Sequence, residues 1–407
     1  MIEGNFAVAQ SGGPTAAINA TLCGVIECAF AAGRKIYGAA NGIRGVLDAK
    51  FTDLNATFSN LNNLQLLKTT PAAYLGSCRY KLPDAAEVNE IYEKIFDNLK
   101  KHNISMFIYI GGNDSMDTVR KLSAYSAEHD KGIYVVGVPK TIDNDLMGTD
   151  HTPGFGSAAK FVATAVSEIA RDCAVYADPS ITVIEIMGRN AGWLTAASAL
   201  ARSTTSSAPH LIYLPEKPLA VDKLISDVEA CGVRNMVIAV SEGIKNEKGE
   251  YFSNLACNTG HDEFGHAQLS GSAKVVESIL KTKFGVKTRS VELNVLQRCS
   301  AHFSSLTDLN ESIEIGKAGA AAAFEGKSGI VMGFERTGDY KTNIISNDVS
   351  GIANLEKIVP DNFMNSTHND VTEAFINYCR PLIQGEPAII TEDGIPKHIS
   401  LQMIKEL

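Results

Sequence analysis

The chain has 407 residues and a mass of 43.5 kDa, which at roughly 150 residues a domain predicts two or three domains. Apolar residues make up 45% and charged residues 20%, a composition that is typical of a soluble globular protein and excludes a disordered or collagenous chain. The net charge is −9 and no basic run is present, so nucleic acid is not expected as a partner. An anionic ligand would therefore have to be bound by a few Arg and Lys side chains gathered locally.

No stretch reaches the ~20 apolar residues that a membrane span needs, and the first residues lack the basic and apolar regions of a signal peptide. A cytoplasmic location without a membrane partner is therefore expected. The eight cysteines are scattered and form no Cys-x-x-Cys pair, so they are expected to be reduced thiols rather than zinc ligands or disulfides.

Short apolar runs alternate along the chain with longer helical patterns, which predicts an α/β fold of parallel strands joined by crossover helices. Five of the runs are predicted strands that lead into polar or glycine-rich turns: residues 6–9, 106–110, 133–138, 182–186 and 236–240. In open parallel sheets, ligands bind just beyond the carboxyl ends of the strands. These turns are therefore the candidate site.

Two doubly wound, Rossmann-like lobes with mainly parallel sheets are expected, with the active site in the cleft between them. The first lobe is predicted over residues 1–154 plus about 297–347, and the second over 155–296 plus about 348–407. Apolar residues at three- and four-residue steps predict an amphipathic helix over 157–173. A close-packed helix is predicted over 318–324, and a long surface loop over 245–266.

Two of the predicted strands end in glycine turns. Gly12 and Gly13 precede Pro14, and Pro at the first helical position leaves the remaining end amides free to bind an anion such as phosphate. A turn that merely reverses the chain is an equally good interpretation of this motif alone. The segment Gly111-Gly112-Asn113-Asp114-Ser115 repeats the pattern and adds a carboxylate at the opening of a helix, where it could also be a simple cap.

A third turn, Thr141-Ile142-Asp143-Asn144-Asp145, places two carboxylates two residues apart on a non-helical segment. In an extended chain they would share a face, which suits metal or proton chemistry. An Asp in this position could take the proton of an alcohol during phosphoryl transfer, while Mg²⁺ and Lys140 neutralise the phosphate oxygens. A solvated Asx turn is the alternative.

Several basic residues beside glycine turns or strand ends could bind a small anion: Arg44, Arg79, Lys81, Arg189, Arg289 and Arg298. Arg suits bidentate phosphate contacts, although each of these residues taken singly would more often be a surface residue. Glu242 could accept a hydrogen bond from a sugar hydroxyl or cap a helix. A metal site at His261, Asp262, Glu263 and His266 is disfavoured, because these residues lie in a polar loop without helix-spaced register.

The segments SGGPTAAIN, LGSCRYKL, GGNDS, PKTIDND, EIMGRNAGW, SEG and LQR occur in this order. On these segments the sequence closely resembles the pyrophosphate-dependent branch of the phosphofructokinase family, over roughly residues 5–330. MGRNAGW and TIDND are specific to that family. The resemblance implies Mg²⁺-dependent, reversible transfer of a phosphoryl group from pyrophosphate to the 1-hydroxyl of fructose 6-phosphate, by a homo-oligomer (dimer or tetramer).

The resemblance also implies roles for individual residues. Asp143 would be the catalytic base, with Asp114, Lys140, Thr141 and Asp145 beside it. The donor phosphates would bind at Gly12, Gly13, Gly112 and Ser115, and the metal at Asn113. The sugar phosphate would be bound by Arg79, Thr141, Asp143, Met187, Gly188, Arg189, Glu242, Arg289, Gln297 and Arg298. The segment after about residue 330 is assigned no chemistry.

Two positions bear on the phosphoryl donor. ATP-using relatives usually carry Gly where this chain has Asp114 and Lys140. A carboxylate at Asp114 occupies space and charge that the α-phosphate of ATP would need, while Lys140 adds a cation near the transferred group. Pyrophosphate is therefore the expected donor; an ATP-dependent phosphofructokinase and a non-catalytic sugar-phosphate sensor are the alternatives.

Three further positions depart from the pattern of the ATP-using relatives. Asn113 stands in place of an Asp, Ser180 in place of an Arg supplied across a subunit boundary, and Val295 in place of a His. The first departure concerns the metal, and the other two concern how the 6-phosphate and a second subunit are contacted.

Overall fold

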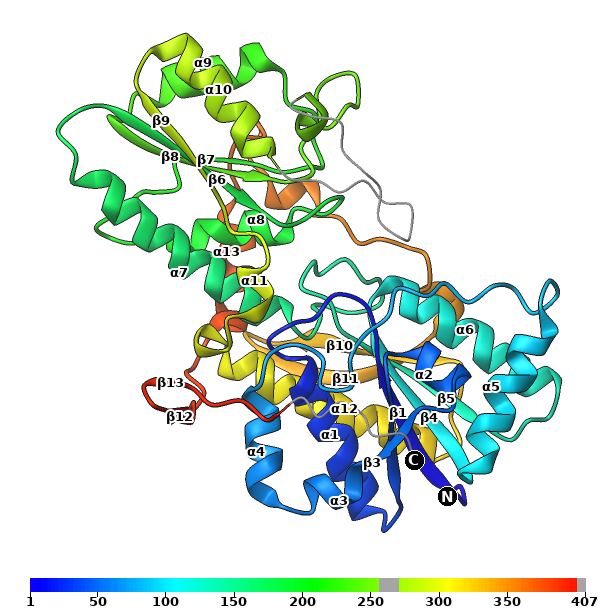
Figure 1. Ribbon diagram of the computed structural model, residues 1–407. Helices are drawn as coiled ribbons and strands as arrows, with labels where there is room; N and C mark the ends of the chain where they lie inside the picture. The colour runs from blue at the N-terminus through cyan, green and yellow to red at the C-terminus, as the bar shows by residue number, and fades with distance from the viewer. Residues whose placement is uncertain (256–270, 401–407) are drawn as a thin grey trace.

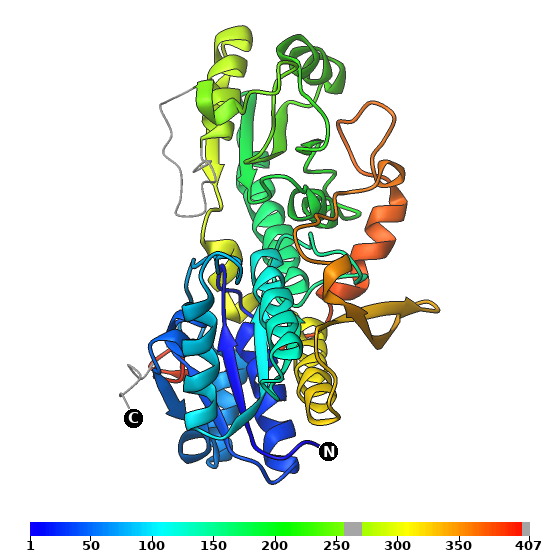
Figure 2. The same cartoon turned by 90° about the vertical axis from the view of Figure 1, so that its right-hand side faces the viewer.

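The computed structural model describes residues 1–255 and 271–400, which form two α/β lobes, each built on its own main sheet (Figure 1). The two lobes lie one above the other, and the chain crosses between them several times (Figure 2). Strand pairing is parallel throughout the smaller sheet and for most pairs of the larger one. The predicted fold class is therefore confirmed.

The larger sheet has seven strands, and only its two edge strands pair in the antiparallel sense. In spatial order the strands are β11 (Lys341–Asp348), β10 (Ile330–Thr337), β5 (Tyr134–Pro139), β4 (Ile104–Gly111), β1 (Asn5–Gln10), β2 (Ile36–Ala39) and β3 (Phe51–Asp53). The central strands β1, β4 and β5 are buried almost throughout, as expected for parallel strands covered on both faces.

Helices cover both faces of the larger sheet. One face packs against the helices α1 (Ile18–Ala31), α3 (Leu54–Phe58), α4 (Leu61–Thr69) and α12 (Leu306–Phe324). The other face packs against α2 (Ile43–Leu47), α5 (Asn89–Lys101) and α6 (Asn113–Glu128). Side chains of the central strands alternate between these two buried clusters, with Val8 on one face and Ala9 on the other. With both faces covered, the carboxyl ends of β1, β4 and β5 remain open, and the residues after them line a cavity shared with the other lobe.

The smaller sheet has four parallel strands in the order β7 (Leu211–Tyr213), β8 (Asn235–Ser241), β6 (Ser180–Ile186) and β9 (Lys287–Glu292). The helices α7 (Phe155–Ala174), α8 (Trp193–Ala197) and α13 (Glu373–Cys379) cover one face. The helices α9 (Val221–Cys231) and α10 (Ser272–Phe284) cover the other. The short helix α11 (Leu296–Cys299) leads back toward the larger lobe.

Several local predictions can be compared with the described residues. The predicted helices over 157–173 and 318–324 are confirmed as parts of α7 and α12. The start of α1 is a correction: the helix begins at Ile18 rather than at Pro14. The Thr15 hydroxyl, two residues before the N-cap residue Ala17, accepts hydrogen bonds from the backbone of Ala17 and Ile18 and so holds a turn there. The glycine turn before it is therefore longer than predicted.

The end of the described chain returns to the larger lobe. Thr70 accepts a hydrogen bond of 2.9 Å from the backbone N–H of Ile399, whose side chain belongs to the buried cluster beneath β1. Ile399 is therefore not on the second lobe, to which the sequence assigns residues 348–407; the remaining lobe boundaries stay a prediction.

Three further expectations from the sequence concern a metal site, the cysteines and membrane-spanning segments. The metal site considered at residues 261–266 lies outside the described residues. The seven described cysteines are all free thiols. Among residues 1–255 and 271–400, no helix is both long enough and apolar enough to cross a bilayer.

Candidate active site

A cavity of about 770 Å³ lies between the two lobes, at the carboxyl ends of β1, β4 and β5 on one side and of β6 and β8 on the other. We refer to this cavity as the cleft. Of the residues to which the family resemblance assigns a role, all line the cleft except Gly188, Gln297 and Arg289. The predicted residues that line it are Gly12, Gly13, Arg79, Gly112, Asn113, Asp114, Ser115, Lys140, Thr141, Asp143, Asp145, Met187, Arg189, Glu242 and Arg298.

The turn after β1 lies close to two cations of the cleft. Gly12 has φ +78°, a conformation that favours glycine, and a Cβ atom added there would lie 3.3 Å from Lys140 Nζ. A Cβ atom on Gly13 would lie 3.1 Å from Nη1 of Arg298, and the Gly13 carbonyl accepts a hydrogen bond from Lys140 Nζ. The two glycines therefore let both cations lie close against the backbone of the turn.

The helix α6 begins at the edge of the same space. Gly112 is its N-cap residue, Asp114 lies exposed in its first turn, and Ser115 is buried. The backbone N–H of Lys140 donates to the carbonyl of Gly111 at 2.8 Å, so the ends of β4 and β5 are directly joined. The sequence-predicted strand, glycine turn and helix are therefore confirmed here, and Asp114 and Lys140 line one cleft.

The side chain of Asn113 is engaged in a way that the sequence does not predict. Its amide oxygen accepts a hydrogen bond of 2.7 Å from the backbone N–H of Asn354, and its amide nitrogen donates at 2.7 Å to the carbonyl of Leu355. Both ends of the amide thus bind the backbone of a segment 241 residues away. Metal binding by Asn113 stays a prediction.

The turn after β5 presents its two carboxylates to the cleft. The Thr141 hydroxyl accepts a hydrogen bond of 3.1 Å from the Asp143 backbone and lies 3.5 Å from Asp143 Oδ2. Asn144 has φ +54°, and its amide oxygen accepts a hydrogen bond from Thr152 at 3.1 Å. The left-handed residue between Asp143 and Asp145 holds the chain in a turn rather than in the extended form expected, yet both carboxylates line the cleft.

The ionisable groups of this turn are strongly perturbed. Desolvation raises the pKa of Asp143, although Lys140 and Arg189 oppose the shift. Desolvation and the charge of Asp143 raise the pKa of Asp145 to about 7. Desolvation lowers the pKa of Lys140 to about 8, against the attraction of Asp143. A proton acceptor and a cation thus lie together in a poorly solvated part of the cleft, as in many catalytic sites.

The smaller lobe contributes a loop after β6 and a turn after β8. The Gly188 backbone N–H donates to Glu242 at 3.2 Å, and the Met187 backbone N–H donates to Gln297 at 3.1 Å. Burial raises the pKa of Glu242 to about 7. Gly188 and Gln297 do not line the cleft, but their hydrogen bonds position Met187 and Glu242, which do.

Arg189 has a donor without a partner. Within the described part of the chain, the buried Nε of Arg189 makes no hydrogen bond. A buried donor left unpaired is costly, and the guanidinium is shaped for bidentate contacts with phosphate oxygens. Arg189, in the loop after β6, and Arg298, whose Nη1 lies near Gly13, give the cleft two more cations that can bind an anion.

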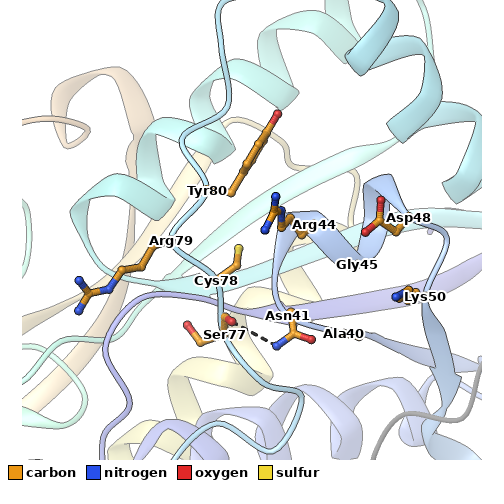
Figure 3. A pocket seen from close by; sticks show the side chains of 10 residues that line it. All are labelled: Ala40, Asn41, Arg44, Gly45, Asp48, Lys50, Ser77, Cys78, Arg79 and Tyr80. Carbon is orange, nitrogen blue, oxygen red and sulfur yellow. Dashed lines mark hydrogen bonds between the residues drawn. The ribbon is translucent and has the colours of Figure 1, made fainter. Parts of the chain in front are cut away.

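Two predicted arginines lie elsewhere. Arg289 is on β9, where Nη1 lies 3.4 Å from Asp172 and the guanidinium stacks over Tyr176, outside the lining of the cleft. Arg44 lines a separate pocket of about 350 Å³ on the larger lobe, with Lys50 and Asp48 (Figure 3).

Arg79 lines both this pocket and the cleft. In Figure 3 its side chain points away from Arg44 and Tyr80, on the other side of the 77–80 segment. Of these two arginines, which the sequence does not distinguish, only Arg79 reaches the cleft.

The cleft also contains residues that sequence reasoning missed. Asn354, Leu355 and Glu356 line it, although they come from the region to which the sequence assigns no chemistry. Asn190 lines it as well, and its amide donates to both oxygens of Glu356 at 3.0 and 3.1 Å. Asn190 lies within the MGRNAGW motif, which could have identified it; residues 354–356 carry no comparable signal.

Comparison with known proteins agrees with this arrangement. The family model "Phosphofructokinase" matches residues 5–292. A pyrophosphate–fructose 6-phosphate 1-phosphotransferase of Rhodospirillum rubrum is 41% identical over 392 residues, covering 94% of this chain and 95% of that protein. The enzyme of the same name from Xanthomonas campestris is 38% identical over 411 residues, covering 99% and 97%.

A solved structure leads to the same family. The crystal structure of a pyrophosphate-dependent phosphofructokinase from Nitrosospira multiformis superposes with a TM-score of 0.90 at 34% identity, covering 100% of this chain and 98% of that one. Sequence, fold and the residues gathered in the cleft thus agree, and the chain belongs to the phosphofructokinase family.

Proposed function

We propose that this chain transfers a phosphoryl group from pyrophosphate to the 1-hydroxyl of fructose 6-phosphate, giving fructose 1,6-bisphosphate and phosphate. The full-length relatives described above carry this activity in their names. The observation that carries the proposal is the buried Lys140, whose ammonium lies against the Gly12–Gly13 turn and shares the cleft with Asp143 and Asp114.

In the proposed reaction, Asp143 accepts the proton of the sugar hydroxyl. The hydroxyl oxygen then bonds to one phosphorus atom of pyrophosphate while the bond from that atom to the bridging oxygen breaks. Inorganic phosphate leaves with the bridging oxygen and the electron pair of that bond. The raised pKa of Asp143 brings its basicity closer to that needed near neutral pH. Lys140 supplies a fixed positive charge where negative charge develops, which is worth more in a poorly solvated site than in water.

The sugar phosphate is proposed to bind toward the smaller lobe. Arg189 and Arg298 would contact the 6-phosphate, and the buried, unpaired Nε of Arg189 supports a ligand contact there. Glu242 lines the cleft and could accept a hydrogen bond from a sugar hydroxyl. Arg79 would act from the opposite wall of the cleft.

Mg²⁺ is the proposed cofactor, and the donor set fits a cation shared with the substrate. Asp145 lines the cleft beside Asp143, whose charge raises the pKa of Asp145. A divalent cation held by Asp145 would relieve this cost and leave Asp143 to accept the proton. In residues 1–255 and 271–400, no cluster of three His, Cys, Asp or Glu side chains could hold a metal by itself. Mg²⁺ commonly binds one or two carboxylates and completes its shell with water and phosphate oxygens. When bound, it would neutralise phosphate charge.

A homo-oligomer, either a dimer or a tetramer, is also proposed. Arg289 lies outside the cleft of its own chain, so a contact between Arg289 and a sugar phosphate would require a second copy. Sedimentation of the purified chain, with and without fructose 6-phosphate, measures this directly; a monomer at assay concentration would contradict it. A cytoplasmic location stays a prediction.

The decisive experiment compares phosphoryl donors. The purified chain is mixed with fructose 6-phosphate and Mg²⁺, and the formation of fructose 1,6-bisphosphate is followed with pyrophosphate or with ATP. We expect turnover with pyrophosphate and little with ATP. Preference for ATP would support an ATP-dependent phosphofructokinase instead. Sugar-phosphate binding without turnover by either donor would support a non-catalytic sensor.

A further inference from the structure

We use the term donor end for the part of the cleft lined by Gly12, Gly13 and the start of α6, and the term strap for residues 354–357. We infer that the strap forms the outer wall of the donor end and restricts the donor to a compact diphosphate. The inference rests on the proposed function, because it concerns which donor the same site accepts. It assigns a role in specificity to a segment that lies beyond the 5–292 match to the family model.

The strap is bound first to the helix that opens the donor end. The Asn113 side chain bonds the backbone N–H of Asn354 and the carbonyl of Leu355, both at 2.7 Å. The Asn354 amide donates to Asp117 on the next turn of α6 at 3.1 Å. Asn354 has φ +63°, so the chain turns sharply at this contact. The residue adjacent to Asp114 thus holds the strap in place.

The strap is bound next to the catalytic turn. The Lys357 backbone N–H donates to the carbonyl of Asp145 at 2.7 Å, and Glu356 forms a β-bridge with Leu146. The buried Lys357 ammonium donates to the carbonyls of Thr149 and Asp150 at 3.0 and 2.8 Å. These bonds join the strap to the segment that carries both candidate catalytic carboxylates.

The smaller lobe supplies a third set of contacts. Asn190 donates to the Glu356 carboxylate at 3.0 and 3.1 Å, and the Trp193 indole donates to the carbonyl of Lys357 at 2.9 Å. The Lys357 ammonium also lies 5.1 Å from the centre of the Trp193 ring. Since the strap is bound to both lobes and to α6, it cannot move outward without breaking several of these bonds.

The position and chemistry of the strap suit a wall against longer donors. Leu355 and Glu356 line the same cleft as Asp114. The Leu355 side chain is 48% exposed, an apolar surface that offers a phosphate chain no hydrogen bond. Two carboxylates, Asp114 and Glu356, would repel the additional charge of a third phosphate. A donor longer than pyrophosphate would have to displace the strap or accept these contacts.

The test uses inorganic tripolyphosphate, which is longer than pyrophosphate but has no nucleoside. For each variant, kcat/KM with tripolyphosphate is divided by kcat/KM with pyrophosphate. Leu355→Ala removes the apolar wall, and Asn113→Ala removes two of the three bonds between α6 and the strap, leaving that of Asn354 with Asp117. Ile358→Ala is the matched control, because Ile358 is 53% exposed, next to the strap, and not part of the cleft lining.

We expect the ratio to be low in the unmodified chain and to rise roughly tenfold in Leu355→Ala and in Asn113→Ala, with no change in Ile358→Ala; pocket changes of this size commonly alter discrimination by that factor. Equal losses with both donors would indicate a merely structural segment and would overturn the inference. Equal use of the two donors by the unmodified chain would overturn it as well, even if a variant failed to fold. Absence of any turnover of pyrophosphate by the unmodified chain would instead contradict the proposed function.

Discussion

Both sheets end at the same cleft, but the charged groups that they supply are held differently. On the larger lobe, Lys140 is only 2% exposed, and the nearby carboxylates Asp143 and Asp145 have raised pKa values because they are poorly solvated. On the smaller lobe, burial likewise raises the pKa of Glu242 to about 7, and Glu242 is held through the backbone of Gly188, but the cation Arg189 remains partly exposed, unlike Lys140.

This difference matches the work proposed for each lobe. A group that exchanges a proton, or stabilises charge that appears only in the transition state, gains from a site with little water. A group that binds a phosphate whose charge does not change has to be reached by that phosphate from solution. We therefore expect changes in the larger lobe to act mainly on kcat and changes in the smaller lobe mainly on KM.

The largest effect is expected at Asp143. Asp143→Asn keeps the shape of the side chain but removes the proton acceptor, so kcat should fall by roughly 10²–10⁴-fold. Affinity for fructose 6-phosphate, measured by calorimetry, should change little. A variant with nearly full kcat would show that Asp143 is not the catalytic base, and the proposed division of roles between the two lobes would be wrong.

Donor choice should respond next. Asp114 is exposed, so water partly screens its repulsion of the α-phosphate of ATP, but its carboxylate also occupies the space that this phosphate would need. Asp114→Gly should therefore make ATP binding detectable. Lys140→Gly should chiefly lower kcat with pyrophosphate. Steady-state kinetics of both single variants and the double variant, at saturating Mg²⁺, separate the two effects. If Asp114→Gly binds no ATP and turns over pyrophosphate normally, the donor argument is wrong.

On the smaller lobe, Arg189→Ala should raise KM for fructose 6-phosphate by about 10–100-fold, the usual cost of a lost charged hydrogen bond. Turnover at saturating substrate should fall much less than in Asp143→Asn. If Arg189→Ala instead lowers kcat strongly and leaves KM unchanged, Arg189 acts in the chemical step, and the smaller lobe does not act mainly on KM.

The pH profile should show groups from both lobes. Glu242 has a pKa of about 7, so its protonation should lower kcat/KM below that pH. Lys140 has a pKa of about 8, so loss of its proton should lower kcat/KM above that pH. Each limb should change by at most about tenfold per pH unit for one ionisation. Arginine stays charged at high pH, so in Lys140→Arg the alkaline fall of kcat/KM should move to higher pH while the acid side is unchanged. If the alkaline fall does not move, it is caused by another group or by the substrates.

The smallest effect is expected from Arg44, which lines the separate pocket of the larger lobe. Arg44→Ala should alter kcat/KM by no more than about twofold, the change expected of a surface substitution. Arg79→Ala, at a residue that also lines the cleft, should lower it several-fold. Equal losses in this pair would show that the second pocket takes part in the reaction.

The sequence by itself determined the elements and most of the site residues. Glycine turns, a carboxylate pair and buried strands are local patterns, and parallel strands bring their carboxyl ends to one edge of a sheet. Gly12, Asp114 and Asp143 could therefore be expected in one place before any coordinates. The start of α1 was misplaced because the Thr15 hydroxyl bonds the backbone of Ala17 and Ile18 in a turn before the helix, which begins at Ile18 and not at Pro14.

Only the tertiary structure decided which distant segments meet the cleft. Asn113 binds residues 354 and 355, Arg44 and Arg79 face different spaces, and Arg289 turns toward Asp172. These outcomes depend on how one lobe packs on the other and on where the chain returns after β11, not on the periodicity of any single segment. A side chain's local pattern predicts the element on which it lies, whereas its partner is decided by the packing of segments hundreds of residues apart.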